Sequence, residues 1–124
     1  MAKFSVGESP LRSIIVVPFT GSGAIAADTA RIQPGVKFRL LAVRLHMSAA
    51  PTTSQNFTVT LDAGDGSAYD TVIYTRDLSV GSVTDLVIPF GGDEYIYEKD
   101  DEIDCAYTNT DVGTYGLAIV YELV

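Results

Sequence analysis

The residues most able to do chemistry in this sequence lie in one acidic stretch. The acidic members are Asp93, Glu94, Glu98, Asp100, Asp101, Glu102 and Asp104. Residues 95–107 read YIYEKDDEIDCAY, and Lys99 is the only opposing charge within them. Such a cluster could bind a divalent cation, carry out acid–base catalysis, or keep the end of a strand in water.

The spacing of these carboxylates does not match a known calcium loop. The D-x-D-x-D-G order of an EF-hand is missing here and in LDAGDGSAYD at 61–70. Asp100, Asp101 and Asp104 are the candidates for a weak cation site, but we expect no metal and no cofactor. Acid–base catalysis requires two carboxyl groups whose environments give them different pKa values, and an exposed turn of like charges does not provide such environments. We interpret the stretch as a solvated turn that protects strand ends, and a small hydrolase using Asp101 and Asp104 is an alternative.

The single histidine and the single cysteine do not suggest a catalytic pair. His46 shares the outward phase of its segment with Arg39 and Arg44, so it is predicted to be a surface residue. Cys105 alternates inward, which predicts a buried, inert thiol, and a lone cysteine allows no intrachain disulfide. We therefore expect no catalytic residues and no enzyme activity.

Length and composition describe one well-packed domain. The chain has 124 residues, of which 47% are apolar and 19% charged. Its net charge of −8 divides into +4 for residues 1–50 and −12 for residues 51–124. So acidic a body repels phosphate backbones, and we expect no nucleic-acid partner. No apolar run is long enough to span a bilayer and no secretory signal is evident, so we expect synthesis in a host cytoplasm and no membrane partner.

Side chains alternate between apolar and polar along most of the chain. This period of two predicts an all-β antiparallel sandwich of about eight strands, with no convincing helical stripe. In the segment 36–47 the apolar phase changes near Leu41 and Ala42, which predicts a β-bulge. The predicted strands lie near residues 13–19, 36–47, 57–62, 69–76, 83–90, 95–97, 103–107 and 114–123.

Residues 1–35 are the least regular part of the sequence. Apart from the strand at 13–19, they are predicted to form an N-terminal arm and a long loop, with a short helix at 24–32 as the alternative. Their basic and apolar side chains could contact neighbouring acidic subunits. The residues suggested for a capsid or subunit interface are Lys3, Phe4, Leu11, Arg12, Arg31 and Lys37.

The order of segments in residues 36–124 resembles that of small virion proteins of tailed bacteriophages. The resemblance lies in FRLLAVRLHMSAAPTTSQNFTVTLDAGDGSAYDTVIYTRDLSVGSVTDLVIPF, then YIYEKDDEIDCAYTNTD with its acidic Y-x-x-x-D-x-I turn, then the closing strand GTYGLAIVYELV. It implies a jelly-roll β-sandwich that decorates, or cements, a capsid. The implied partners are a homo-oligomer, expected to be a trimer, and the major capsid protein.

Two classes of function follow from these observations. The first is a non-enzymatic decoration protein located on the capsid surface of a virion, where binding several subunits at once stabilises the shell. The second is a carbohydrate- or receptor-binding module of a phage tail or head fibre. Exposed tyrosines would supply the stacking faces that such a module needs.

Overall fold

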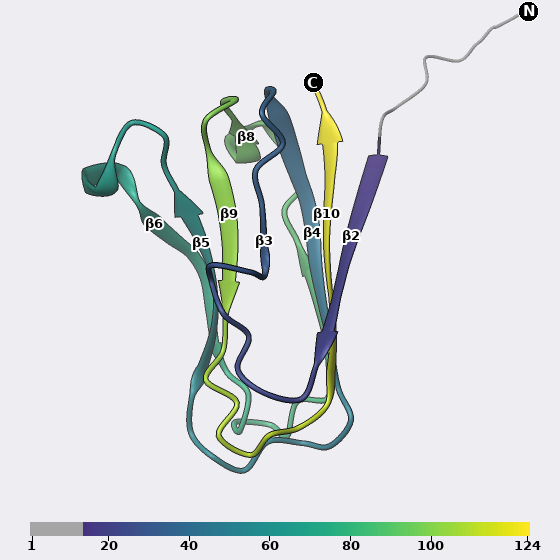
Figure 1. The fold of residues 1–124 in the computed structure, drawn as a ribbon. Coiled ribbons are helices and arrows are strands. Elements are labelled where there is room, and N and C mark those ends of the chain that lie inside the picture. Colours follow the sequence, from purple (N-terminus) through teal and green to yellow (C-terminus); the bar gives the residue numbers. More distant parts are fainter. Residues whose placement is uncertain (1–13) are drawn as a thin grey trace, which may run out of the picture.

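The computed structural model describes residues 14–124, which form two antiparallel β-sheets packed face to face (Figure 1). The first sheet has the strand order β2-β10-β4-β7, and the short β8 also pairs with β4. Its strands are β2 (Ile14–Gly21), β10 (Tyr115–Leu123), β4 (Phe38–Met47), β7 (Asp85–Pro89) and β8 (Ile96–Tyr97). The second sheet, in the order β3-β9-β5-β6, consists of β3 (Arg31–Ile32), β9 (Glu102–Ala106), β5 (Asn56–Asp62) and β6 (Thr71–Asp77).

The strand pairs are nested along the chain. The innermost pair is β5 with β6, followed outward by β4 with β7, β3 with β9 and β2 with β10. Successive pairs alternate between the two sheets, and the pairings of β4 with β10 and β5 with β9 join them. One long antiparallel ribbon is thus rolled into a sandwich, which is the jelly-roll arrangement. The predicted all-β, jelly-roll-like fold is confirmed.

The predicted change of phase in β4 is a β-bulge. Ala42 pairs with Val120 on β10 and Leu40 pairs with Tyr121, so Leu41 has no residue opposite it. Side chains of a strand alternate between its two faces, so one extra residue shifts the alternation by one position. The apolar residues before and after the bulge therefore all face the core. The side chains of β4 that are buried as a result are Phe38, Leu40, Val43, Leu45 and Met47.

The core lies between the sheets and is filled by the inward side chains of both. Phe57 on β5, Ile103 on β9 and Ile119 on β10 are all fully buried. The ring of Phe38 lies 5.6 Å from that of Tyr97 and 5.8 Å from that of Tyr121. Most of the aromatic surface therefore stabilises the interior, as the inward phase of these residues predicted.

The segment between β2 and β4 crosses from the first sheet to the second. Ile25 and Tyr107 exchange two backbone hydrogen bonds of 2.9 and 3.0 Å, and Ala30 accepts one of 2.8 Å from the amide of Cys105. The side chains of Ile25 and Ala30 are buried. The connection at residues 20–35 is therefore attached to the second sheet and corrects our expectation of an arm there, whereas the strand expected at 13–19 is present as β2. The other part of the expected arm, residues 1–13, lies outside the described residues.

Helical structure is minor in the part of the chain that the structure describes. Two 3₁₀ turns occur, η1 (Ser67–Tyr69) and η2 (Asp93–Tyr95), and residues 14–124 contain no α-helix. The helix considered for 24–32 is instead a turn closed by bonds from Thr29 to the Ala26 carbonyl, followed by β3. None of the helices described is long and apolar enough to span a membrane.

Candidate functional site

The outer face of the first sheet carries a row of apolar side chains. The cross-strand register places Val16, Val120, Ala42 and Pro89 in one row across all four main strands. Val16 retains 49% of its accessible surface, and Val87, on the edge strand β7, retains 68%. Neighbouring apolar side chains on the surface of a folded protein often mark a contact with a partner.

A shallow groove runs across this face where β10 carries small residues. Gly116 lies between Thr20 on β2 and His46 on β4, and the next outward residue, Ala118, lies between Pro18 and Arg44. The groove has a volume of about 400 Å³ and opens to solvent. A Cβ added at Gly116 would have no atom within 4 Å, so the missing side chain is what leaves the space. We call this feature the Gly116 groove.

Polar side chains border the Gly116 groove on the side of β7. Nδ1 of His46 lies 2.7 Å from Oδ1 of Asp85, and this hydrogen bond lowers the pKa of the Asp85 carboxyl. Both side chains are exposed, as is Arg44, so the prediction of an outward His46 is confirmed. The groove thus offers a cation, an imidazole and a carboxylate beside an apolar surface.

The two sheets differ in charge. The strands of the first sheet contain two arginines and two carboxylates, and therefore have no net formal charge. One of each, Arg39 and Glu122, forms an ion pair of 3.0 Å. The strands of the second sheet contain two arginines and four carboxylates. A chain with a net charge of −8 thus keeps one sheet face neutral, and that face would approach an acidic surface with the least repulsion.

The structure separates the members of the acidic stretch. Asp101 lies in the turn before β9, where its two oxygens accept hydrogen bonds of 2.9 Å from the amides of Gly64 and Glu98. Asp100 is exposed beside Lys99, with 4.0 Å between the charged atoms. Asp104 instead projects from the outer face of β9. The suggested trio of Asp100, Asp101 and Asp104 is therefore not a single site, and Asp101 serves to close a turn.

Asp104 belongs to a different cluster, on the outer face of the second sheet. Carboxylate oxygens of Asp62, Glu102 and Asp104 all lie within 4.8 Å of one another. Asp62 on β5 is directly opposite Glu102 on β9, and Asp104 is the next outward residue along β9. Like charges placed opposite each other destabilise a sheet unless something offsets them. We call these three residues the carboxylate cluster.

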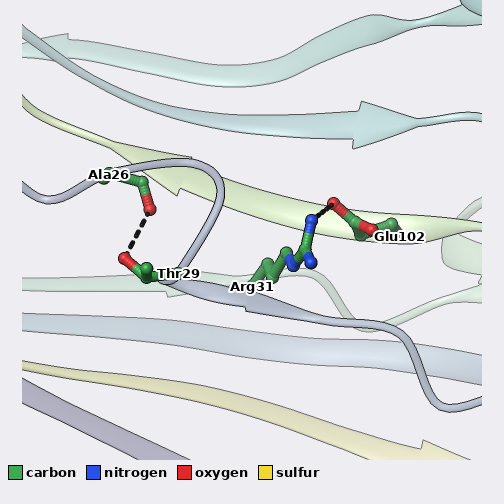
Figure 2. Close-up of polar contacts among 4 residues, drawn as sticks. All are labelled: Ala26, Thr29, Arg31 and Glu102. Atoms are coloured by element: carbon green, nitrogen blue, oxygen red, sulfur yellow. Dashed lines mark hydrogen bonds and ion pairs between the residues drawn. The ribbon is translucent and has the colours of Figure 1, made fainter.

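One arginine offsets part of this charge. Figure 2 shows the side chain of Arg31 reaching from β3 to Glu102, and the distance from Nη1 to Oε2 is 3.3 Å. The turn at Ala26–Thr29, in the same view, leads the chain into β3 and so sets the position of Arg31. With Arg31 included, the ionised cluster has a formal charge of −2.

Burial and the neighbouring carboxylates both favour a proton on the cluster. Burial, followed by the hydrogen bond and the charge of Glu102, raises the pKa of Asp104 to about 8. The pKa of Asp62 is raised too, first by desolvation and then by the charges of Asp70 and Glu102. The folded cluster therefore holds a proton more tightly than a free aspartate does, unless another cation replaces that proton.

Sequence reasoning missed Asp62 and Glu102 as members of this site. The sequence did indicate the face of the strand on which each side chain lies. Glu102 and Asp104 are two residues apart and therefore share a face, and Asp62 alternates with the apolar residues of its own strand. What joins them is the pairing of β5 with β9, two strands about 40 residues apart in the chain. That pairing follows from the way the ribbon is rolled and has no local signal.

The remaining predicted residues lie in ordinary structural roles or outside the described part. Cys105 is fully buried, as predicted, and burial raises the pKa of its thiol to about 12. Of the suggested interface residues, Arg31 is paired with Glu102, and Lys37 is an exposed residue that precedes β4. Lys3, Phe4, Leu11 and Arg12 lie outside the described residues.

Comparison of the sequence with protein-family models and with curated proteins found no match.

Proposed function

We propose that this protein is a non-enzymatic structural protein of a tailed-phage virion, which binds the capsid surface as an oligomer and stabilises the lattice. A trimer is the expected form. The jelly-roll topology is compatible with this role but does not carry the proposal, because one fold serves many functions. The observation that carries it is the neutral, apolar outer face of the first sheet.

This face has the properties of a docking surface for other protein subunits. Ile14, Val16 and Val87 are exposed upon it, and the Gly116 groove would admit a side chain of a partner. Burying such side chains stabilises a complex in proportion to the apolar area removed from water. Several copies held in one oligomer would then bind several capsid subunits at once, and each contact would raise the effective concentration for the next.

The test uses two valines in matched positions. Val87 lies on β7, an edge strand of the first sheet, and Val72, which retains 56% of its surface, lies on β6, an edge strand of the second. The full-length chain and its Val87→Glu and Val72→Glu variants would be co-sedimented with capsids of the phage whose genome encodes the chain. Both substitutions place a charge on an exposed strand position, so both variants should fold.

We expect the unaltered chain to bind capsids and Val87→Glu to bind roughly tenfold more weakly or worse, while Val72→Glu binds normally. Sedimentation velocity of each variant would show whether the same face also holds the oligomer together. The proposal would be overturned if the unaltered chain failed to bind capsids, or if the two variants bound equally.

The alternative, a receptor-binding module, is favoured by one feature of the same face. Arg44, His46 and Asp85 beside the groove could hydrogen-bond the hydroxyl groups of a sugar. Phe19 is the aromatic residue that contributes to the lining. Binding to a glycan array that is lost on replacing Arg44 with Ala, together with no binding to capsids, would establish this alternative.

A further inference from the structure

We propose that Asp62, Glu102 and Asp104 form a binding site for a divalent cation, with Ca²⁺ as the preferred ion, on the outer face of the second sheet. The three side chains come from two strands, β5 and β9, and Arg31 on β3 borders them. A bound ion would therefore connect strands that are far apart in the sequence. This inference is independent of the capsid-binding proposal, which concerns the opposite face.

The charge of the site matches a divalent ion. Three carboxylates and the guanidinium of Arg31 leave a formal charge of −2, which a single Ca²⁺ neutralises. A monovalent ion or a single proton would leave the cluster negative. Because Glu102 has one oxygen bound to Arg31, its other oxygen is the one that can turn to a metal.

A buried oxygen without a partner gives the second, independent indication of a ligand. The side chain of Asp104 is buried within the cluster. Its Oδ1 is buried and accepts no hydrogen bond from any residue in the described part of the chain. A buried carboxylate oxygen left unsatisfied is costly, and buried charges in proteins are normally paired or bound to a metal. A cation between the three residues would satisfy this atom.

The ligand chemistry selects the class of ion. Carboxylate oxygens are hard ligands, and the cluster contains no sulfur or imidazole nitrogen, so Ca²⁺, Mg²⁺ and Mn²⁺ fit better than zinc or copper. Ca²⁺ accepts irregular sets of carboxylate oxygens, whereas Mg²⁺ demands near-ideal octahedral geometry and usually keeps several waters. Three carboxylates whose oxygens all lie within 4.8 Å of one another therefore suit Ca²⁺ better than Mg²⁺. Water would complete its coordination, since Ca²⁺ takes more than three ligands.

A cation and a proton compete for the same carboxylate oxygens of the site. The groups that face Asp104 are Glu102 on its own strand, Asp62 on β5 and Arg31 on β3, and Asp70 acts on Asp62 from the turn after η1. Because the ligands of a metal must be deprotonated, Ca²⁺ binding would release protons from the cluster and weaken as pH falls. Proton release is thus a signature that a nonspecific effect of ionic strength would not produce.

The experiment measures thermal unfolding of the full-length, EDTA-treated protein above pH 8, with added CaCl₂ or MgCl₂ and with NaCl at equal ionic strength. The site variant is Asp104→Asn, and the matched control is Asp100→Asn, which removes an equal charge from the exposed turn four residues earlier. At a Ca²⁺ concentration about a hundred times Kd, we expect Tm of the unaltered protein and of Asp100→Asn to rise by roughly 10 °C. Mg²⁺ should produce a smaller rise.

Asp104→Asn should show no specific rise in Tm with Ca²⁺. Calorimetry in buffers of different ionisation enthalpy should show that Ca²⁺ binding releases protons from the unaltered protein at neutral pH. The proposal would be overturned if Ca²⁺ and NaCl shifted Tm equally, or if Asp104→Asn responded as Asp100→Asn does. A Tm that depends on pH but not on Ca²⁺ would show that the cluster holds only a shared proton.

Discussion

Arg31 lies directly opposite Asp104 in the β3–β9 pair, yet its guanidinium binds Glu102. Asp104 is thereby left beside two other carboxylates, and its Oδ1 has no hydrogen-bond partner in residues 14–124. The ion pair therefore offsets the charge of Glu102 only, and Asp104 still requires a proton or a cation to offset its own charge. The charge of the carboxylate cluster therefore depends on pH and on the cations present.

In the presence of a chelator, the folded protein should lose stability as pH rises from about 4 to about 8. The pKa of Asp104 is raised from an ordinary value of 3.8 to about 8, so the folded state binds this proton more tightly than the unfolded state does. The resulting stabilisation is complete below pH 3.8 and is lost as pH rises to about 8. Urea titrations at successive pH values would measure the loss.

The variant Asp104→Asn separates this effect from other titrations. Asparagine resembles the protonated acid at every pH, so the variant should lack this loss and should be more stable than the unaltered protein above pH 8. The raised pKa of Asp62 acts in the same direction, so the variant should still lose some stability as pH rises. Equal pH profiles for the two proteins would show that Asp104 titrates normally.

Replacing Gly64 by alanine should destabilise the protein by about 1–3 kcal/mol. An added Cβ would lie 2.5 Å from Cβ of Asp100 and 2.8 Å from its carbonyl oxygen. The turn at Gly64 must therefore move away from the turn before β9, which also stretches the hydrogen bond from Gly64 to Asp101. Denaturant midpoints would measure the change.

Gly23→Ala is the matched control for that substitution, because a Cβ there meets nothing within 4 Å. It should change stability by less than about 0.5 kcal/mol. A similar cost at both positions would show that the cost does not arise from the contact with Asp100.

The strands and their inward faces were predictable because the signal for them is local. Each predicted strand is present within a few residues, and the bulge opposite Val120 was visible as a change of apolar phase near Leu41. The exception is β3, where Arg31 and Ile32 form only two ladder pairs. So short a strand has no alternation to detect, and its position depends on the strand β9 that it joins.

The candidate site was much less predictable than the fold. Asp104 was considered for a metal, but with Asp100 and Asp101, its neighbours in sequence. Its real neighbours, Asp62 and Glu102, depend on which strands are adjacent and in what register. Similarly, Gly116 is an ordinary glycine in the sequence, and it lines a groove only because β2 and β4 flank it.

Asp111 should stabilise the loops at one end of the sandwich, and this stabilisation should be lost in acid. Its carboxylate accepts hydrogen bonds from the amides of Thr52 and Thr53, at 2.8 and 3.1 Å, and one of 2.6 Å from the Thr53 hydroxyl. These bonds lower the pKa of Asp111 to about 2. Its contribution is therefore present above pH 3.8 and is lost as pH falls towards 2.

Asp111→Asn should accordingly lower Tm by a few degrees at neutral pH, and this difference should shrink in acid. Asp65→Asn, in an exposed turn, is the control and should leave Tm unchanged. Thermal unfolding followed by circular dichroism at several pH values would measure both. A deficit for Asp111→Asn that stayed constant down to pH 2 would contradict the assignment.

Gly116→Val separates the use of the groove from the stability of the sheet. The new side chain would occupy open space on a central strand, and glycine is a poor strand residue, so folding stability should stay the same or increase by up to about 1 kcal/mol. If a partner inserts a side chain into the Gly116 groove, the same variant should lose most of its capsid binding. Thr75→Val, which adds an apolar side chain to the outer face of β6, should bind normally. Normal capsid binding by a stable Gly116→Val would show that the groove is not part of the contact, whereas Val87→Glu reports on the edge of the same face.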